Sequence, residues 1–76
     1  MTEQQKMELE IAITRLETRI DSYTRTAKRT KKQAVYDAEC GYRESAQFNK
    51  GQQFALEYVI EDLNIVLLGL KGMVEE

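Results

Sequence analysis

The sequence predicts an all-α protein: a long antiparallel two-helix hairpin that associates with further copies of itself into a dimeric four-helix bundle or a higher oligomer. Three observations predict this fold. Two stretches of the chain share the same apolar spacing, a glycine stands midway between them, and the second stretch carries more apolar residues than one hairpin can cover.

The two stretches repeat apolar residues at alternating steps of four and three, which is the spacing of one helical face in a coiled coil. The first comprises Leu9, Ile13, Leu16, Ile20, Tyr23 and Ala27, and the second comprises Leu56, Ile60, Leu63, Leu67, Leu70 and Val74. When the first residue of one stretch is paired with the last residue of the other, and so on inward, the position numbers of every pair add to 83. An antiparallel hairpin requires such a constant, so we expect the two faces to pack against each other.

The same constant places the turn at Gly41-Tyr42. Glycine just past a helix end adopts the left-handed conformation without a steric penalty from Cβ. The chain contains no proline, and no glycine before Gly41. We therefore expect a single domain, residues 1–76, with a first helix from about residue 3 to about residue 40, capped by Thr2, and a second from about residue 43 to about residue 74.

Gly51 lies inside the second of these helices and leaves an alternative open. Glycine in a helix interior costs about 1 kcal/mol relative to alanine. A break over Phe48-Asn49-Lys50-Gly51 would divide the second helix and give three helices instead of two.

The second helix carries apolar residues that the hairpin face does not use. On a helical wheel, Val59, Val66 and Met73 lie on one flank, and Phe54, Tyr58, Ile65 and Leu68 lie on the far side. A helix that is apolar on most sides belongs inside a bundle. We therefore expect at least two hairpins to associate, most simply as a four-helix dimer.

Composition excludes several classes of protein. With 76 residues, 32% of them charged and 42% hydrophobic, the chain is one small domain that is neither disordered nor membrane-spanning by composition. One cysteine and no histidine exclude an internal disulfide and the common zinc sites. The first residues are polar, so we expect no signal peptide and no membrane anchor, and a cytoplasmic protein.

We also expect no enzyme activity, and neither a metal nor a cofactor. Glu57 and Glu61 are four residues apart, but neither a histidine nor a third inward carboxylate joins them. Cys40 lies beside Glu39 at an expected helix C-terminus, and both features oppose formation of a thiolate. The sequence predicts no strand, and hence no glycine-rich phosphate loop following one.

A cluster of basic residues in the first helix is the strongest indication of a binding site. Arg25, Lys28, Arg29 and Lys32 follow the spacing i, i+3, i+4, i+7 and form the basic stripe, on the side of the helix opposite Tyr23, Ala27 and Ala34. Residues 24–53 hold seven bases and three acids, a net charge of +4, whereas the remainder holds four bases and ten acids, a net charge of −6. Thr26 can add a hydroxyl and Tyr36 an aromatic ring, so these six residues are the predicted anion-binding site.

The segment from Ala38 to Ala46, with Lys50-Gly51-Gln52 and the run from Ala55 to Leu63, resembles small helical-hairpin accessory proteins of bacteriophages and prophages. The resemblance covers the turn and the second helix, about half of the chain, and Tyr42 departs from the polar residue often found after the turn glycine. It implies an accessory protein in the host cytoplasm that acts by stoichiometric binding to a host component. It identifies no functional residue.

Together these observations give two leading hypotheses. In the first, a non-enzymatic homo-oligomer inhibits or sequesters a host component, either a protein of antiviral defence or an anionic nucleotide signal, through the basic stripe. In the second, the same stripe binds nucleic acid. A structural or assembly subunit without a ligand is a third possibility.

Overall fold

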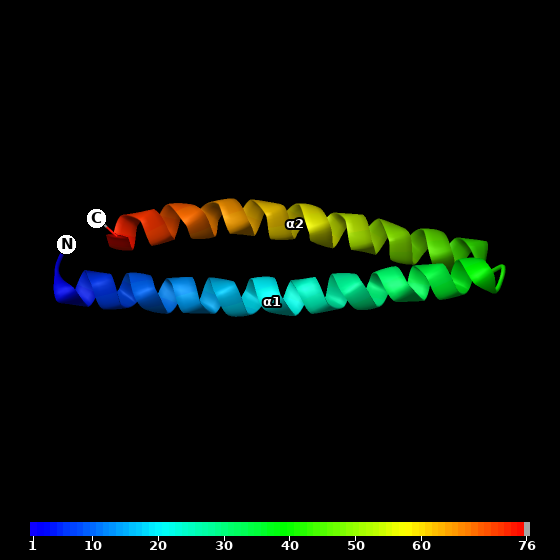
Figure 1. The fold of residues 1–76 in the computed structure, drawn as a ribbon, viewed down its shortest axis with the longest axis horizontal. Helices are drawn as coiled ribbons and strands as arrows, with labels where there is room; N and C mark the ends of the chain where they lie inside the picture. Colours follow the sequence, from blue (N-terminus) through cyan, green and yellow to red (C-terminus); the bar gives the residue numbers. More distant parts are fainter. Residues whose placement is uncertain (76) are drawn as a thin grey trace.

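The computed structural model describes residues 1–75 and contains two helices, α1 (Glu3–Glu39) and α2 (Arg43–Glu75). They lie side by side in opposite directions, so that the chain begins and α2 ends at the same end of a thin rod (Figure 1). Its Cα atoms span 58 × 15 × 13 Å. The predicted hairpin is therefore confirmed, and the helices end within one residue of the predicted bounds. α2 runs without interruption through Gly51, so the three-helix alternative is wrong.

The start of α1 is fixed by reciprocal hydrogen bonds between Thr2 and Gln5. The backbone N–H of Gln5 donates to Oγ1 of Thr2 at 3.1 Å, and the backbone N–H of Thr2 donates to Oε1 of Gln5 at 3.0 Å. This capping box satisfies backbone N–H groups that have no partner within the helix. Thr2 is thus the helix cap that the sequence predicts.

The turn is a Schellman motif centred on Gly41, whose φ is +81°. The N–H of Gly41 donates to the carbonyl of Ala38 at 3.1 Å, and the N–H of Tyr42 donates to the carbonyl of Asp37 at 2.8 Å. These two bonds satisfy carbonyls that the end of α1 would leave unpaired. Glycine is needed here because other residues strongly disfavour a positive φ.

The two predicted faces form the contact between the helices. All twelve residues of the two stretches are buried or half-buried, and Ile13, Ala27 and Leu67 are the most enclosed apolar ones, at 9%, 7% and 9% exposure. Because each helix has only one neighbour, no large side chain within residues 1–75 is completely enclosed. The hairpin therefore has a narrow core along its length rather than a globular one.

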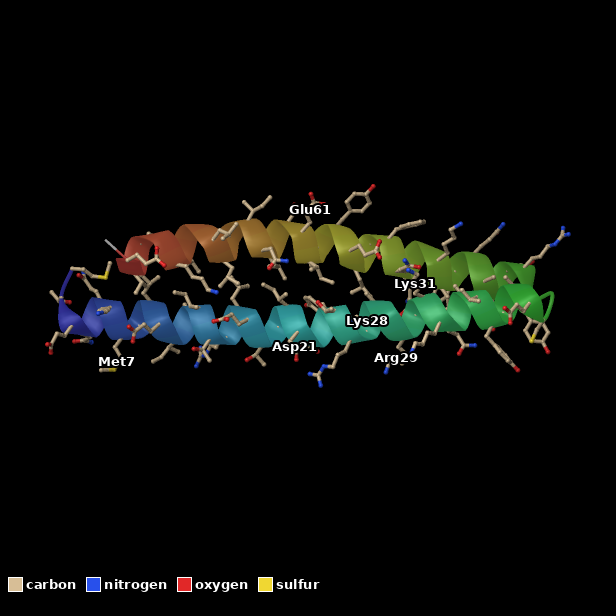
Figure 2. All side chains as sticks on the ribbon, in the orientation of Figure 1. Met7, Asp21, Lys28, Arg29, Lys31 and Glu61 are labelled. Carbon is tan, nitrogen blue, oxygen red and sulfur yellow. The ribbon has the colours of Figure 1, made fainter. Side chains whose placement is uncertain are left out.

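The seven apolar residues predicted to be left over on α2 are all exposed, from 42% for Val59 to 71% for Leu68. Figure 2 shows side chains projecting from α2 on the side away from α1, and Glu61 is one of them. These residues are spread along much of α2 and are left uncovered by α1.

Candidate functional site

The basic stripe lies on the surface of α1, in the half of the helix nearer the turn. Arg25, Lys28, Arg29 and Lys32 are all exposed, and Figure 2 shows Arg29 pointing away from α2. The stripe forms on one helix because residues three and four apart are neighbours on a helical surface. The four cations are therefore available to an anionic partner.

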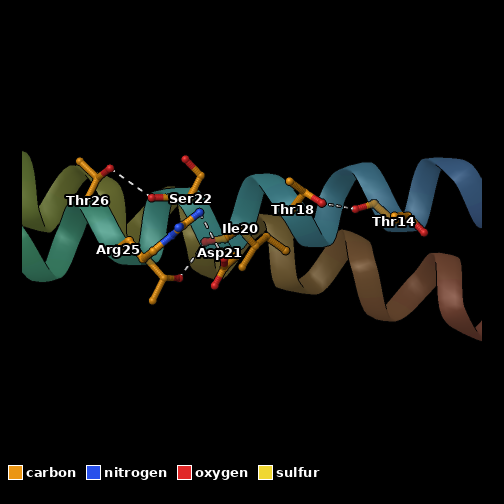
Figure 3. A network of polar contacts seen from close by, with 8 residues as sticks. Thr14, Thr18, Ile20, Asp21, Ser22, Arg25 and Thr26 are labelled. Carbon is orange, nitrogen blue, oxygen red and sulfur yellow. Dashed lines mark hydrogen bonds and ion pairs between the residues drawn. The ribbon is translucent and has the colours of Figure 1, made fainter.

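One cation of the stripe has an acidic neighbour. Arg25 forms an ion pair of 3.4 Å with Asp21, one turn earlier, and both side chains are about 70% exposed (Figure 3). Exposed pairs of this kind contribute little to stability, because water and salt screen them. Within residues 1–75, no carboxylate forms an ion pair with Lys28, Arg29 or Lys32. The positive charge of the stripe is thus largely uncompensated.

Thr26 lies beside the stripe rather than within it. It is half-buried, and its hydroxyl donates to the carbonyl of Ser22 at 3.1 Å (Figure 3). Thr24 and Thr30 bond the carbonyls four residues earlier in the same way, at 2.8 Å each. Because these hydroxyl hydrogens are engaged by the helix itself, the threonines can offer a ligand only an acceptor.

Tyr36 extends the stripe by one further turn. Its side chain is 58% exposed, and together with Gln33 and the four cations it lines a shallow surface depression of about 590 Å³. Five of the six predicted site residues therefore share one surface, with Thr26 at its edge. The depression is wide open, because the outside of a single helix is convex and cannot enclose a ligand.

A second surface near the turn, which we call the turn-end groove, involves both helices. It is lined by three alanines, three basic residues and an aromatic ring, namely Ala34, Ala38, Ala46, Lys31, Arg43, Lys50 and Phe54, together with Val35, Gln47 and Gln53. Nζ of Lys50 lies 5.9 Å from the centroid of the Phe54 ring, a cation–π distance. The groove holds about 620 Å³ and is mainly apolar, with basic edges.

Sequence reasoning missed the turn-end groove. Alanines of both helices near the turn line this hollow. The available signal was the coincidence of alanines at the contact positions with lysines on both flanks. Recognising it requires the pairing of the two helices.

Asp37 is a buried carboxylate at the same end of the hairpin, and sequence reasoning did not single it out. It is only 3% exposed and accepts three hydrogen bonds. Oγ of Ser45 donates at 2.6 Å, Nδ2 of Asn49 at 2.9 Å and Nε2 of Gln33 at 2.9 Å. The bond from Ser45, and after it those from Gln33 and Asn49, hold the pKa of the Asp37 carboxyl below its ordinary value, against the opposing effect of burial.

Because Ser45 and Asn49 belong to α2 and Asp37 belongs to α1, this cluster joins the two helices. The signal in the sequence was that the steps of four and three, continued beyond Ala27, reach Asp37. A buried polar residue at such a position favours one register over others. We assign Asp37 to the architecture of the turn rather than to ligand binding.

Other chemical sites have no support in the described part of the chain. Residues 1–75 contain no group of three or more potential metal ligands close enough to share an ion. Cys40 is exposed, and Glu57 accepts a hydrogen bond of 3.0 Å from Gln53. Neither α1 nor α2, as far as residue 75, combines enough length and apolarity to cross a bilayer.

Comparison with known proteins found no protein-family model, no curated protein and no solved structure that matches this chain.

Proposed function

We propose that this protein is a non-enzymatic binding protein that acts stoichiometrically on an anionic partner through the basic stripe. The observation that carries the proposal is the set of exposed cations on α1, of which Lys28, Arg29 and Lys32 have no ion-pair partner within residues 1–75. Like charges three and four residues apart weaken a helix by a few tenths of a kcal/mol per pair. Four like charges on one face destabilise the isolated helix, and an anionic partner that neutralises them would explain why they lie there.

An acidic surface of another protein is the partner that this shape fits best. Pockets for small ligands enclose most of the ligand, whereas the depression beside Tyr36 is shallow and open. A nucleotide signal would leave most of its surface in water there. The proposal therefore favours inhibition or sequestration of a host protein, the mode of action implied by the resemblance to phage accessory proteins.

We further propose that the protein acts as a dimer of hairpins. Phe54, Ile65 and Leu68 are among the exposed apolar residues of α2, at 47%, 63% and 71% exposure. Burying a large aliphatic side chain contributes about 1.5–3 kcal/mol, so association offers this helix a considerable gain. Two hairpins would present two basic stripes to a two-fold or repeated target.

The test compares charge-reversal variants against defined anionic probes. Binding of fluorescent poly-glutamate, of a 20-base-pair DNA duplex and of a labelled cyclic dinucleotide is measured by anisotropy at about 50 mM salt. The variants are Lys28→Glu with Arg29→Glu in the stripe and, as a control with the same charge change, Lys6→Glu with Arg15→Glu in the acidic end. Circular dichroism checks that helicity is retained.

The proposal expects poly-glutamate binding that the stripe variant abolishes and the control variant keeps. Retention of the DNA duplex, with an affinity that falls steeply as salt rises, would replace the proposal by the nucleic-acid alternative. Equal binding by the two variants would remove the stripe from the function altogether.

A further inference from the structure

Unpaired charges of opposite sign lie along one side of α2. Successive helical residues are about 100° apart, so Lys50, Glu57 and Glu61 point within about 40° of a common direction. Phe54 and Leu68 lie on the same side of the helix, 47% and 71% exposed. We call this side of α2, together with the turn-end groove beside it, the mixed-charge face.

These charges cannot neutralise one another within one hairpin. Along the helix, at 1.5 Å per residue, Lys50 lies about 10 Å from Glu57 and about 16 Å from Glu61, both too far for an ion pair. Within residues 1–75, neither Glu57 nor Glu61 forms an ion pair, and the groove's Lys31, Arg43 and Lys50 form none either. Glu57 accepts a hydrogen bond from Gln53, and Gln53 lines the groove.

A second copy, laid antiparallel on the first, brings the opposite charges together. If a two-fold axis passes between residues 55 and 56, Lys50 of each copy faces Glu61 of the other. The same rotation places Phe54 near its counterpart and Leu68 over the turn end of the groove. We propose that the mixed-charge face is a self-association surface, and that its occupant is the mixed-charge face of a second copy.

Charge complementarity is the reason for choosing a second copy as the occupant. In this register Lys50 of the groove meets Glu61 of the other copy, while Leu68 lies beside Arg43 over the mainly apolar groove. In a two-fold arrangement the basic half of each face contacts the acidic half of the other, so neither half is left free for a third copy. The assembly is therefore a dimer and not a filament.

This inference rests on the proposed dimer and specifies its interface. It leaves the function of the basic stripe intact, because Arg25, Arg29 and Lys32 lie on the other helix, on its exposed surface. The two-fold arrangement also explains why basic and acidic residues are concentrated at opposite ends of the rod, because the basic end of each copy would lie along the acidic end of the other.

The test is a charge exchange followed by sedimentation equilibrium of the full chain. Lys50→Glu alone and Glu61→Lys alone each place like charges across the interface twice, and each is expected to weaken the dimer at least about tenfold. The double variant, and a mixture of the two single variants, restore opposite charges at both positions. Both are expected to return to within about threefold of the wild-type dissociation constant.

Lys6→Glu, which makes the same charge change outside the face, is expected to leave the dimer unchanged. If the wild type dimerises but neither single variant weakens the dimer, the proposed interface is wrong and the proposed dimer stands. The same conclusion follows if the mixture of the two single variants fails to restore the dissociation constant. A wild-type chain that stays monomeric at millimolar concentration would overturn both. A variant that loses helicity by circular dichroism is replaced by Lys50→Gln or Glu61→Gln, each expected to weaken the dimer by a smaller factor.

The single cysteine provides an independent measurement. Cys40 is exposed at the turn, so a spin label there reports the distance between the two turns of a dimer. In the proposed arrangement the turns lie at opposite ends, about 45 Å apart by the helical rise. A separation below about 20 Å would mean that the two hairpins run in the same direction, and would overturn the inference.

Discussion

The hydroxyl of Ser45 donates a hydrogen bond of 2.6 Å to Oδ2 of Asp37, and this bond links α2 to α1 immediately after the turn. The amides of Gln33 and Asn49 complete the set of donors around the same carboxylate. No buried side-chain oxygen or nitrogen within residues 1–75 lacks a hydrogen-bond partner. Ser45 and Asp37 therefore close the turn end of the hairpin with a fully satisfied polar cluster.

Removing the acceptor should destabilise the hairpin more than removing one donor. Asp37→Ala leaves three donors without their acceptor, whereas Ser45→Ala leaves a carboxylate that still accepts two bonds. We expect both variants to unfold at lower temperature than the wild type, with the larger decrease for Asp37→Ala, as measured by thermal circular dichroism. Glu39→Ala, a nearby exposed carboxylate, is the control and should change the midpoint little.

Stability should depend on pH through Asp37. The folded state lowers the pKa of this carboxyl, and the unfolded chain has the ordinary value of about 3.9. Between the folded and unfolded pKa values the unfolded chain binds more protons, so stability rises with pH there. The contribution of Asp37 is thus complete above about pH 4–5 and is lost as pH falls through the folded pKa.

Urea unfolding of the wild type and of Asp37→Ala from pH 6 to pH 2 measures this contribution. We expect the difference in unfolding free energy between them to be largest near pH 6 and to shrink toward pH 2. A constant difference across the series would mean that the ionised form of Asp37 is not what stabilises the turn.

The same substitution should have opposite effects at two glycines. Gly41 has φ +81°, and an alanine there is strained by about 1–2 kcal/mol. Gly51 lies inside α2, where an added Cβ would meet no atom within 4 Å. Gly51→Ala should therefore stabilise the protein by about 1 kcal/mol through helix propensity.

Urea denaturation of Gly41→Ala and Gly51→Ala measures both effects in the same way. Because the chemical change is identical, the difference between the two variants isolates the backbone conformation. Destabilisation by Gly51→Ala would indicate that another molecule approaches α2 closely at this position.

The narrow core should depend strongly on its few enclosed residues. Leu67 is 9% exposed, and Leu67→Ala should reduce the unfolding free energy by about 2–3 kcal/mol, the lower part of the range for core leucines, because a thin core collapses around the cavity. Met7 is 60% exposed, and Met7→Ala should change stability by no more than about 0.5 kcal/mol. Chemical denaturation of the two variants is the measurement, and similar losses would contradict the assigned core.

The sequence alone determined the elements, the register and the basic stripe. Each is a property of spacing along one chain: contact residues such as Leu16 and Leu67 repeat at steps of four and three, the paired positions place the turn at Gly41, and the four cations of the basic stripe share one helical face whatever lies beside them. Helical periodicity relates position to direction without reference to any distant residue, which is why these predictions agree with the structure.

Only the tertiary structure decided which residues meet across the two helices. The turn-end groove is lined by Ala34 of α1 and Ala46 of α2, and the cluster around Asp37 needs donors from both helices, so neither is visible in the spacing of one stretch. Thr26 lies beside the stripe, and its hydroxyl donates to the Ser22 carbonyl of its own helix, a choice of rotamer that spacing does not specify. The direction in which a side chain leaves a helix follows from its position in the sequence. The depth of a groove and the hydrogen-bond partners across the hairpin arise only when two helices pack together.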